Sequence, residues 1–218
     1  VLSEIYNFNT GIIAIGDNWT RKLIYGRINE VSPNFKFISA IHPHAIIGKN
    51  AIIGKGTMIM AGAIVNSDAK VDDFCIINTK ASLGHDSVLE KFSSLAPNST
   101  IGGNVKIGAY TAICLSASVI QDVKIGKHSI IGASSLVNKN VEDYKMVYGI
   151  PAKVIKSIKQ GEKYLYHIGD YTKEKKPIKQ SNGLEIITEK KNWDNVLNAL
   201  GSYDFYHTYN YHMLSKIE

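Results

Sequence analysis

Branched aliphatic residues recur at every sixth position through the middle of the chain. The series runs from Ile41 to Val137, and all seventeen of its positions are Ile, Leu or Val. A small or compact residue stands four places after each of them, from Ala45 to Val141. Neither the 3.6-residue period of a helix nor the alternation of an ordinary strand produces this register. The pattern predicts short strands, each forming one flat side of a prism, with one aliphatic side chain per strand buried on the axis.

Three sides make one coil of 18 residues, so the repeats of residues 41–142 predict a mainly β protein, a parallel β-helix of between five and six coils. Residues one coil apart should stack about 4.8 Å from each other, like paired strands. Gly, Asn or Asp often follows the aliphatic position, as at Gly48, Asp72 and Gly84. We expect these residues to accommodate the dihedral angles of the corners.

The segment before the repeats, residues 1–40, predicts a partial α/β unit. Its expected elements are a strand, a helix and a second strand, over Gly11–Ile15, Trp19–Val31 and Phe35–Ile38. Asp17 or Asn18 can cap the helix. A βαβ unit belongs to a small parallel sheet, but no Gly-rich phosphate loop precedes this one.

The segments after the repeats divide into three. Residues 143–158 close the β-helix with an apolar plug followed by Gly and Pro. Residues 159–183 are Lys-rich without a period, which indicates a basic linker. Structure restarts in residues 184–218, with a strand-like stretch and an amphipathic helix ended by Gly201. His207 and His212 in this tail are interpreted as exposed or half-packed side chains, not as a metal site.

Composition narrows the class of protein. The chain has 218 residues, 44% hydrophobic and 20% charged, which is too apolar for a disordered chain. No apolar run is long enough to cross a bilayer, and the start shows no signal-peptide pattern. Two cysteines exclude a disulfide scaffold and suit a reducing, cytoplasmic compartment. The net charge of +6 suits an anionic small molecule as well as nucleic acid. Because the first residue is Val, we expect a piece of a longer or processed chain.

The candidate chemistry lies at one predicted corner. His85 is third in its six-residue unit, so its imidazole should point away from the core and can serve as a general base. Asp86 is adjacent and can orient the ring. Gly103 lies one coil later, directly over His85, and leaves its backbone N–H unobstructed. A base beneath an amide donor is what acyl transfer from a thioester requires, because one group takes the proton and the other stabilises the oxyanion.

Several ordered motifs resemble one family. They are Ile12–Ile28, Ile41–Ala45, Asn78–Asp86, Ile101–Val105 and Gly149–Lys153. Over residues 10–158 the chain resembles the sugar O-/N-acetyltransferases of the NeuD/PglD type, which include sialic acid O-acetyltransferases and nucleotide-linked aminosugar N-acetyltransferases. The resemblance implies a left-handed β-helix, acetyl-CoA as donor, a sugar or nucleotide-sugar acceptor of bacterial surface glycan synthesis, and a homotrimer with active sites between neighbouring solenoids. It implies no metal, nucleic acid or membrane insertion, and it leaves O- or N-acetylation open.

The resemblance also implies roles for single residues. His85 matches the catalytic base, Asp86 its acidic neighbour, and Gly103 the glycine whose N–H meets the thioester carbonyl. Asn78 falls where the acceptor is contacted, and Ser94 stands where some members carry a second histidine. Residues at positions that hold pantetheine and nucleotide are Leu115, Gly132, Ala133, Lys139, Gly149, Pro151 and Lys153. The family's N-terminal Gly-rich segment is absent, so residues 1–40 match only part of a sugar-nucleotide-binding unit. The tail from Leu184 weakly resembles the opening of a GNAT-like acyltransferase domain.

Two other functions stay open from the residues. A carbonic-anhydrase-like metalloenzyme needs three converging histidines, yet His42, His44 and His128 do not lie a whole number of coils from His85. The remaining alternative is a non-catalytic solenoid scaffold. A test of acetyl-CoA binding distinguishes the two, because the acetyltransferase should bind acetyl-CoA and the scaffold should not.

Overall fold

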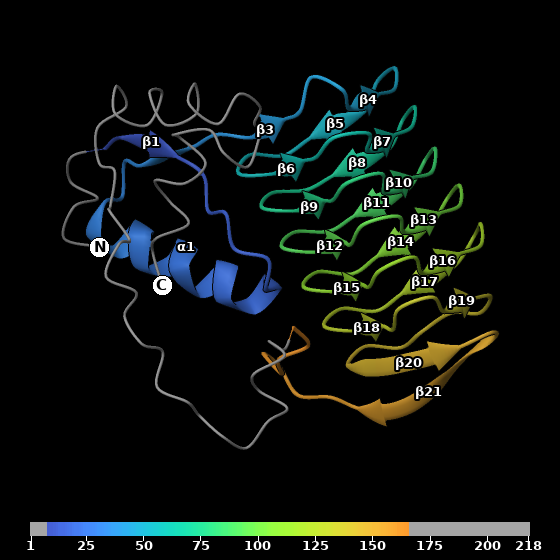
Figure 1. Cartoon of the computed structure of the whole chain (residues 1–218). Helices are drawn as coiled ribbons and strands as arrows, with labels where there is room; N and C mark the ends of the chain where they lie inside the picture. Colours follow the sequence, from blue (N-terminus) through green and yellow to red (C-terminus); the bar gives the residue numbers. More distant parts are fainter. Residues whose placement is uncertain (1–7, 166–218) are drawn as a thin grey trace, which may run out of the picture.

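Seventeen two-residue strands wind around one axis as a parallel β-solenoid in the computed structural model, which describes residues 8–165 (Figure 1). They form three flat faces that the chain visits in turn. Face I holds β3 (Ala40–Ile41), β6 (Met58–Ile59), β9 (Ile76–Ile77), β12 (Ser94–Leu95), β15 (Ala112–Ile113) and β18 (Ile130–Ile131). Face II holds β4 (Ile46–Ile47), β7 (Ile64–Val65), β10 (Ser82–Leu83), β13 (Thr100–Ile101), β16 (Ser118–Val119) and β19 (Leu136–Val137). Face III holds β5 (Ile52–Ile53), β8 (Lys70–Val71), β11 (Val88–Leu89), β14 (Lys106–Ile107) and β17 (Lys124–Ile125).

The predicted coil length is confirmed by the strand register. Leu95 of β12 pairs with Ile113 of β15, and Leu89 of β11 pairs with Ile107 of β14. Both pairs join residues 18 apart, as in the other ladders of the solenoid. A residue at one corner therefore lies one rung, about 4.8 Å, from the residue 18 positions later.

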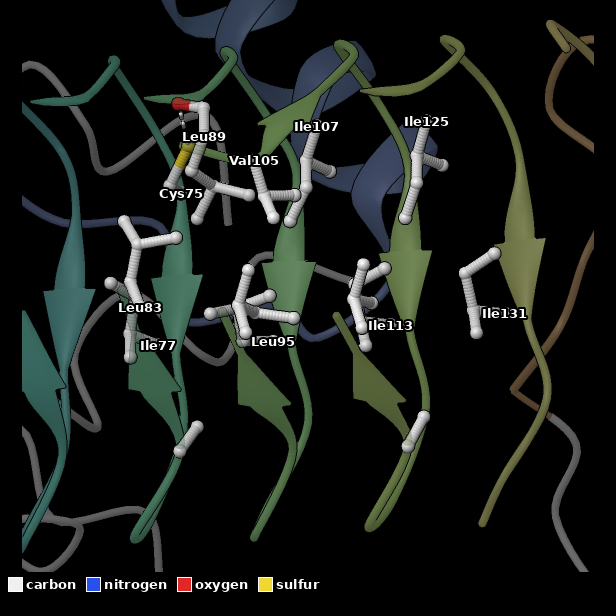
Figure 2. Packing of buried hydrophobic residues seen from close by; sticks show 14 of the residues in the cluster. Cys75, Ile77, Leu83, Leu89, Leu95, Val105, Ile107, Ile113, Ile125 and Ile131 are labelled. Atoms are coloured by element: carbon white, nitrogen blue, oxygen red, sulfur yellow. Dashed lines mark hydrogen bonds between the residues drawn. The ribbon is translucent and has the colours of Figure 1, made fainter. Parts of the chain in front are cut away.

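The axis of the solenoid is the hydrophobic core, as the six-residue period predicts (Figure 2). From Ile59 onward every predicted aliphatic position is buried, and each contributes roughly 1.5–3 kcal/mol. The first coil differs, because Ile41 and Ile47 remain 44% and 38% exposed. No further coil stacks on that end within residues 8–165, so its side chains are covered from one side only.

The corners differ from the expectation for glycine and aspartate. The positive backbone φ falls three residues after the aliphatic position, not directly after it, and is adopted there by residues such as Phe74, Asp86 and Tyr110. Glycine occurs directly after the aliphatic position because the backbone of the next coil lies too close for a side chain. A Cβ on Gly84 would lie 2.1 Å from the carbonyl oxygen of Gly102 in the next coil.

The N-terminal segment is the predicted βαβ unit with a shorter first strand. β1 (Thr10–Gly11) pairs in parallel with β2 (Lys36–Phe37), and α1 (Asn18–Val31) lies between them in the chain. Asp17 is the N-cap, and its side chain accepts a hydrogen bond of 2.8 Å from the Thr20 N–H. The expected strand over Gly11–Ile15 ends at Gly11 because its apolar residues pack against face I instead of continuing the ladder.

A buried arginine anchors α1 to the solenoid. Arg21 is fully buried, and burial lowers its pKa. Its guanidinium donates to the carbonyls of Phe74 at 2.8 Å and Phe92 at 3.1 Å on the solenoid, and to Ile15 at 2.7 Å and Gly16 at 3.1 Å before the helix. Carbonyl dipoles thus replace the water that this charge loses. The contacts fix the loop before α1 against face I.

Aromatic rings stack along the corner between faces III and I. Phe74, Phe92, Tyr110 and His128 follow one another at the coil spacing, with adjacent ring centroids 4.5–5.6 Å apart. Tyr144 continues the column at 5.0 Å from His128. We call these five residues the aromatic ladder. Trp19 of the α1 N-terminus packs against it, 5.6 Å from the Tyr110 ring.

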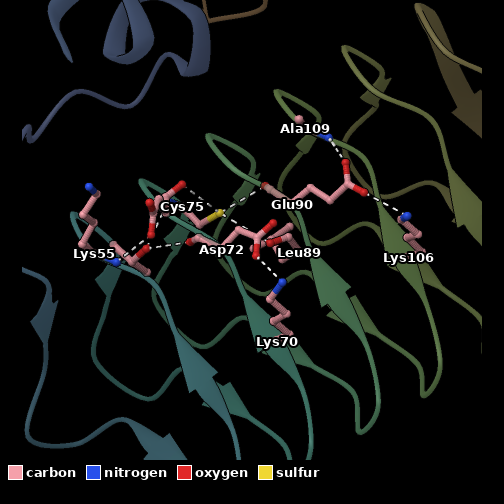
Figure 3. Close-up of polar contacts among 10 residues, drawn as sticks. Lys55, Lys70, Asp72, Cys75, Leu89, Glu90, Lys106 and Ala109 are labelled. Carbon is pink, nitrogen blue, oxygen red and sulfur yellow. Dashed lines mark hydrogen bonds and ion pairs between the residues drawn. The ribbon is translucent and has the colours of Figure 1, made fainter. Parts of the chain in front are cut away.

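Charged side chains at the same corner also join neighbouring coils (Figure 3). Glu90 accepts a hydrogen bond of 3.1 Å from the Ala109 N–H and forms an ion pair of 3.0 Å with Lys106. The Cys75 thiol lies 3.2 Å from the Glu90 carbonyl, and burial raises its pKa to about 12. Glu90 and Lys106 thereby tie neighbouring coils together.

A hairpin closes the other end of the solenoid. β20 (Lys145–Gly149) extends face I and pairs antiparallel with β21 (Ala152–Ser157). The expected apolar plug is smaller than predicted, because Val147 is buried whereas Ile150 and Ile155 are 74% and 61% exposed. The first residues of the expected basic linker pack back onto α1: the backbone of Gly161 leaves no room for a Cβ beside the Trp19 ring.

The strand and helix predicted within residues 184–218, with His207 and His212, lie outside the described residues. Among residues 8–165, no helix is long and apolar enough to cross a membrane.

Candidate functional site

The predicted base lies at the corner between faces II and III, directly after β10. The Nδ1 atom of His85 lies 2.7 Å from a carboxylate oxygen of Asp86, and both side chains are largely exposed. The neighbouring coils hold this backbone, because the His85 carbonyl accepts a hydrogen bond of 2.8 Å from Asn104 and the Asp86 N–H donates to Ser67 at 3.2 Å. In the neutral ring, Nδ1–H donates to Asp86, which leaves Nε2 as the basic atom.

The imidazole stacks on Gly103, as the 18-residue coil predicts. A Cβ built on Gly103 would lie 2.5 Å from both Cε1 and Nε2 of His85, so only glycine leaves the ring this position. No acceptor within residues 8–165 takes the Gly103 N–H, which leaves it for another molecule. A basic nitrogen and an open amide donor therefore lie within one rung of each other.

The same corner continues toward the hairpin end of the solenoid. The registers of Ile101 with Val119 and of Val119 with Val137 place Gln121 and then Lys139 above Gly103. Lys139 is three rungs from His85, about 14 Å at the spacing of paired strands. The backbone of Lys139 therefore lies above that of His85 along the solenoid axis.

A cavity of about 390 Å³ lies on face I, at its corner with face II. It contains four of the predicted binding residues, namely Asn78, Ser94, Leu115 and Ala133. Its remaining lining is mostly apolar. The volume is within the range of small-molecule sites.

Other predicted cofactor residues lie at the hairpin end of this cavity. The ring of Tyr148 lies flat on Gly132, where a Cβ would approach it to 2.0 Å, and Tyr148 lines the cavity. Gly149 has a φ of 107° and donates to the Ser135 hydroxyl at 3.1 Å. Lys153 pairs with Tyr148 across the hairpin, and Pro151 is in the loop between the two strands.

The structure therefore divides the predicted site between two edges of face II. His85, Asp86, Gly103 and Lys139 are at the corner with face III, whereas none of them lines the cavity at the corner with face I. In one chain, the predicted base and the cavity therefore lie at different corners.

Three of the lining residues that the sequence did not predict come from outside the solenoid and its closing hairpin. Tyr164 and Leu165 come from the stretch assigned to the linker, and Gly16 precedes α1. No period relates these positions to the repeats, so only the folded chain brings them to the cavity. Cys114, by contrast, belongs to the repeats. It lies two coils after Asn78, so its place at the same corner could have been predicted from the spacing. Desolvation raises the pKa of the Cys114 thiol to about 11.

The other histidines considered for a metal site do not lie at the corner of His85. His42 and His44 contact each other in the first coil, with ring centroids 5.4 Å apart, and His128 belongs to the aromatic ladder. The residues that the structure describes contain no cluster of three or more His, Cys, Asp or Glu side chains able to hold a metal ion.

Comparison with solved structures identifies similar proteins, although no protein-family model and no curated protein matches the chain. PerB from Caulobacter crescentus, crystallised with CoA and GDP-perosamine, is 32% identical, with a TM-score of 0.68 over 71% of this chain and 75% of that chain. The acetyltransferase domain of PglB from Neisseria gonorrhoeae, crystallised with acetyl coenzyme A, is 32% identical, with a TM-score of 0.63 over 66% and 69%. WeeI from Acinetobacter baumannii, at 22% identity and a TM-score of 0.66 over 71% and 74%, shares the fold. Given this identity and coverage, the chain belongs to the family of hexapeptide-repeat sugar acetyltransferases with a β-solenoid fold.

Proposed function

We propose that this protein transfers the acetyl group of acetyl-CoA to the amino group of a nucleotide-linked aminosugar, as an enzyme of the NeuD/PglD type in bacterial surface glycan synthesis. The observation that carries the proposal is the His85 ring, held by Asp86 at 2.7 Å and stacked on Gly103. The similarity to PerB, which was crystallised with CoA and GDP-perosamine, supports this donor and this class of acceptor.

The reaction is a direct attack on the thioester. The acceptor nitrogen bonds to the acetyl carbonyl carbon while Nε2 of His85 takes its proton. Asp86 stabilises the imidazolium that forms, and the Gly103 N–H donates to the oxyanion of the tetrahedral intermediate. The C–S bond then breaks, and CoA leaves as the thiol after it receives the proton. Lys139, about three rungs from the base, is placed to meet a phosphate of CoA.

The division of the site supports the proposed homotrimer. The base edge of one copy must meet the cavity edge of the next to complete a site, which is a head-to-tail contact that closes as a ring. Face II suits the inside of this ring, because its outward strand residues include Ile46, Ser82 and Leu136 and none is charged. By contrast, face III carries Lys70, Lys106 and Lys124 on its strands.

Two further assignments belong to the same proposal. We also assign residues 8–40 to binding of the sugar nucleotide, because Gly16 of this segment lines the cavity. The enzyme works in the cytoplasm, since Cys75 and Cys114 are both free thiols.

The test is His85→Ala, assayed for release of CoA from acetyl-CoA with a panel of nucleotide-linked aminosugars and sialic acids. We expect kcat to fall by about 10²–10⁴-fold, because general-base catalysis is lost. Acetyl-CoA should still raise the melting temperature, since the base is not needed for binding. His44→Ala is the matched control, because it removes another exposed corner histidine, and it should keep full activity.

Near-normal turnover in His85→Ala would remove the assigned base. A wild-type protein that consumes no acetyl-CoA and gains no stability from it would instead favour the scaffold. The product decides between nitrogen and oxygen as acceptor: an acetyl ester is cleaved by hydroxylamine, whereas an acetamide survives.

A further inference from the structure

We propose that Tyr164 and Leu165 form a wall of the cavity that selects the acceptor by size. The inference rests on the proposed function for the identity of the acceptor. Both residues end a stretch, residues 158–165, that leaves the hairpin and returns along α1; we call it the strap. The strap begins with the buried Ile158, whose N–H donates to the Tyr144 carbonyl at 2.9 Å.

The strap is held in place by local contacts. Glu162 accepts a hydrogen bond of 3.0 Å from the Lys159 N–H and pairs with Lys156 of β21. Gly161 is against the Trp19 ring, where a Cβ would lie 2.6 Å from the nearest ring atom. These contacts hold the turn against β21 and against α1. Tyr164, which follows the turn, therefore approaches the cavity in a defined orientation.

Tyr164 joins the two parts of the protein that border the cavity. Its hydroxyl donates to the Gly16 carbonyl at 3.3 Å, and the Ser94 hydroxyl is 3.5 Å away on β12. Because the phenol proton goes to Gly16, Ser94 donates to the phenol oxygen. Burial raises the pKa of Tyr164 to about 12, so the phenol remains a neutral donor. Arg21 donates to the same Gly16 carbonyl at 3.1 Å, and both sides of this loop are therefore fixed.

The position of the strap along the solenoid indicates the acceptor end of the cavity. Tyr164 meets Ser94, in the stretch between Asn78 and Ala96 that runs alongside the coils of His85 and Gly103. Leu115 and Ala133 lie one and two coils farther, at the level of Gln121 and Lys139. In a ring whose axis is parallel to the solenoid, the partner's base faces the level of the strap. The strap then borders the acceptor, whereas the far end of the cavity holds the pantetheine arm.

The wall is packed against the loop before α1. The side chain of Leu165 would be 3.4 Å from a Cβ on Gly16, which is ordinary van der Waals contact. Opposite the strap are the short side chains of Ser94, Ala112 and Cys114. A bulkier substituent on the sugar edge that faces the strap must therefore displace Tyr164 or Leu165.

The experiment uses Tyr164→Ala and Leu165→Ala in the full chain, with two readouts. The first is the alkylation rate of Cys114 by iodoacetamide at pH 9, corrected with Cys114→Ser; Cys75 is fully buried and stays protected in the folded protein. The second compares KM for acceptor with KM for acetyl-CoA over acceptors of increasing bulk. Tyr144→Phe is the matched control, because it removes a tyrosine hydroxyl outside the cavity.

We expect both variants to speed Cys114 alkylation about tenfold, since the wall that shields the thiol is removed. Acceptor KM should rise about tenfold in Tyr164→Ala while KM for acetyl-CoA stays within about twofold, because only the acceptor end is altered. Bulky acceptors should gain in kcat/KM relative to small ones. Tyr164→Phe keeps the ring and should retain the size preference.

An unchanged rate of Cys114 alkylation in both variants would contradict the proposed wall. An active variant with the same preference among acceptors as the wild type would contradict it too. Leu165 is 53% exposed, so Leu165→Ala should fold even where Tyr164→Ala does not. The alkylation readout needs no turnover. A wild-type protein that acetylates nothing would therefore refute the proposed function, and the alkylation rates would still decide whether the strap limits access.

Discussion

Single residues make the corner of the proposed base, His85, different from the other corners. Between faces II and III, the residue three places after the aliphatic position has a positive φ in each coil from Asn50 to Asp122. Asn and Asp side chains at this position pair between coils, as Asn50 does with Asp68 at 2.9 Å and Asn104 with Asp122 at 2.8 Å. Asp86 lies between these two pairs. Its carboxylate is thereby available for His85, so the orientation of the base follows from which neighbours already have partners.

Gly103→Ala tests this geometry at the residue scale. The added Cβ would lie 2.5 Å from the His85 ring, so the imidazole must move and kcat should fall about 10²-fold. Gly26→Ala is the matched control, because its Cβ would meet nothing within 4 Å in the middle of α1. That control should keep full activity and gain about 0.5–1 kcal/mol of stability, measured by thermal unfolding. Full activity in Gly103→Ala would contradict the stacked arrangement.

At the scale of elements, the aromatic ladder connects the solenoid to α1. Each ring contacts the ring in the next coil, and Trp19 of α1 packs against Tyr110 and His128. His128 is 8% exposed, and its pKa is lowered by burial and by Lys127, against a smaller opposite effect of Asp143. Burial in the aromatic ladder therefore favours the neutral form of His128 in the folded protein.

The sign of the resulting pH dependence follows from linkage. The folded-state pKa of His128 lies below the unfolded value of about 6.5, so the unfolded chain binds the proton first as the pH falls. Stability from this group is complete above pH 6.5 and decreases below it. We expect His128→Phe, which keeps the stacked ring, to reduce the fall in melting temperature between about pH 7 and pH 5.

Tyr110→Phe is the control for the ladder, because it changes a neighbouring ring without removing a group that titrates in this range. It should keep the pH dependence of the wild type. If the melting temperature of His128→Phe fell with pH as much as that of the wild type, other groups would be responsible for the loss of stability in acid.

At the scale of the whole molecule, the proposed site, divided between two edges of face II, predicts that activity requires an assembly of chains. Co-refolding His85→Ala with Ala133→Trp, a substitution that fills the cavity from an exposed position, tests this directly. Each variant alone should be inactive. Random mixed rings place an intact base beside an intact cavity at roughly a quarter of the sites, so about that fraction of wild-type activity should return.

Simple mixing of the two folded variants is the control, since assembled rings should not exchange subunits during the assay. Recovery there would point to rapid exchange between rings. An inactive co-refolded mixture that elutes as a trimer would place the complete site within one chain.

The repeated part of the fold was predictable because its contacts are periodic. Ile77, Leu95 and Ile113 stack because each is 18 residues from the next, and the same arithmetic places Gly103 over His85. The aromatic ladder obeys this spacing too and could have been found at Phe74, Phe92 and Tyr110. The corner dihedrals were misassigned because glycine marks close approach between coils as well as a positive φ.

The amino-acid sequence by itself determined the coil length, the buried axis and the pairing of the base with a bare amide. These depend on local units in a fixed register, so each position implies its neighbours. Only the tertiary structure decided where Arg21, Gly16 and Tyr164 meet, and that the base and the cavity occupy opposite edges of one face. Tyr164 and Gly16 are 148 residues apart and belong to no repeat, so their contact depends on how the flanking segments pack and not on any spacing along the chain.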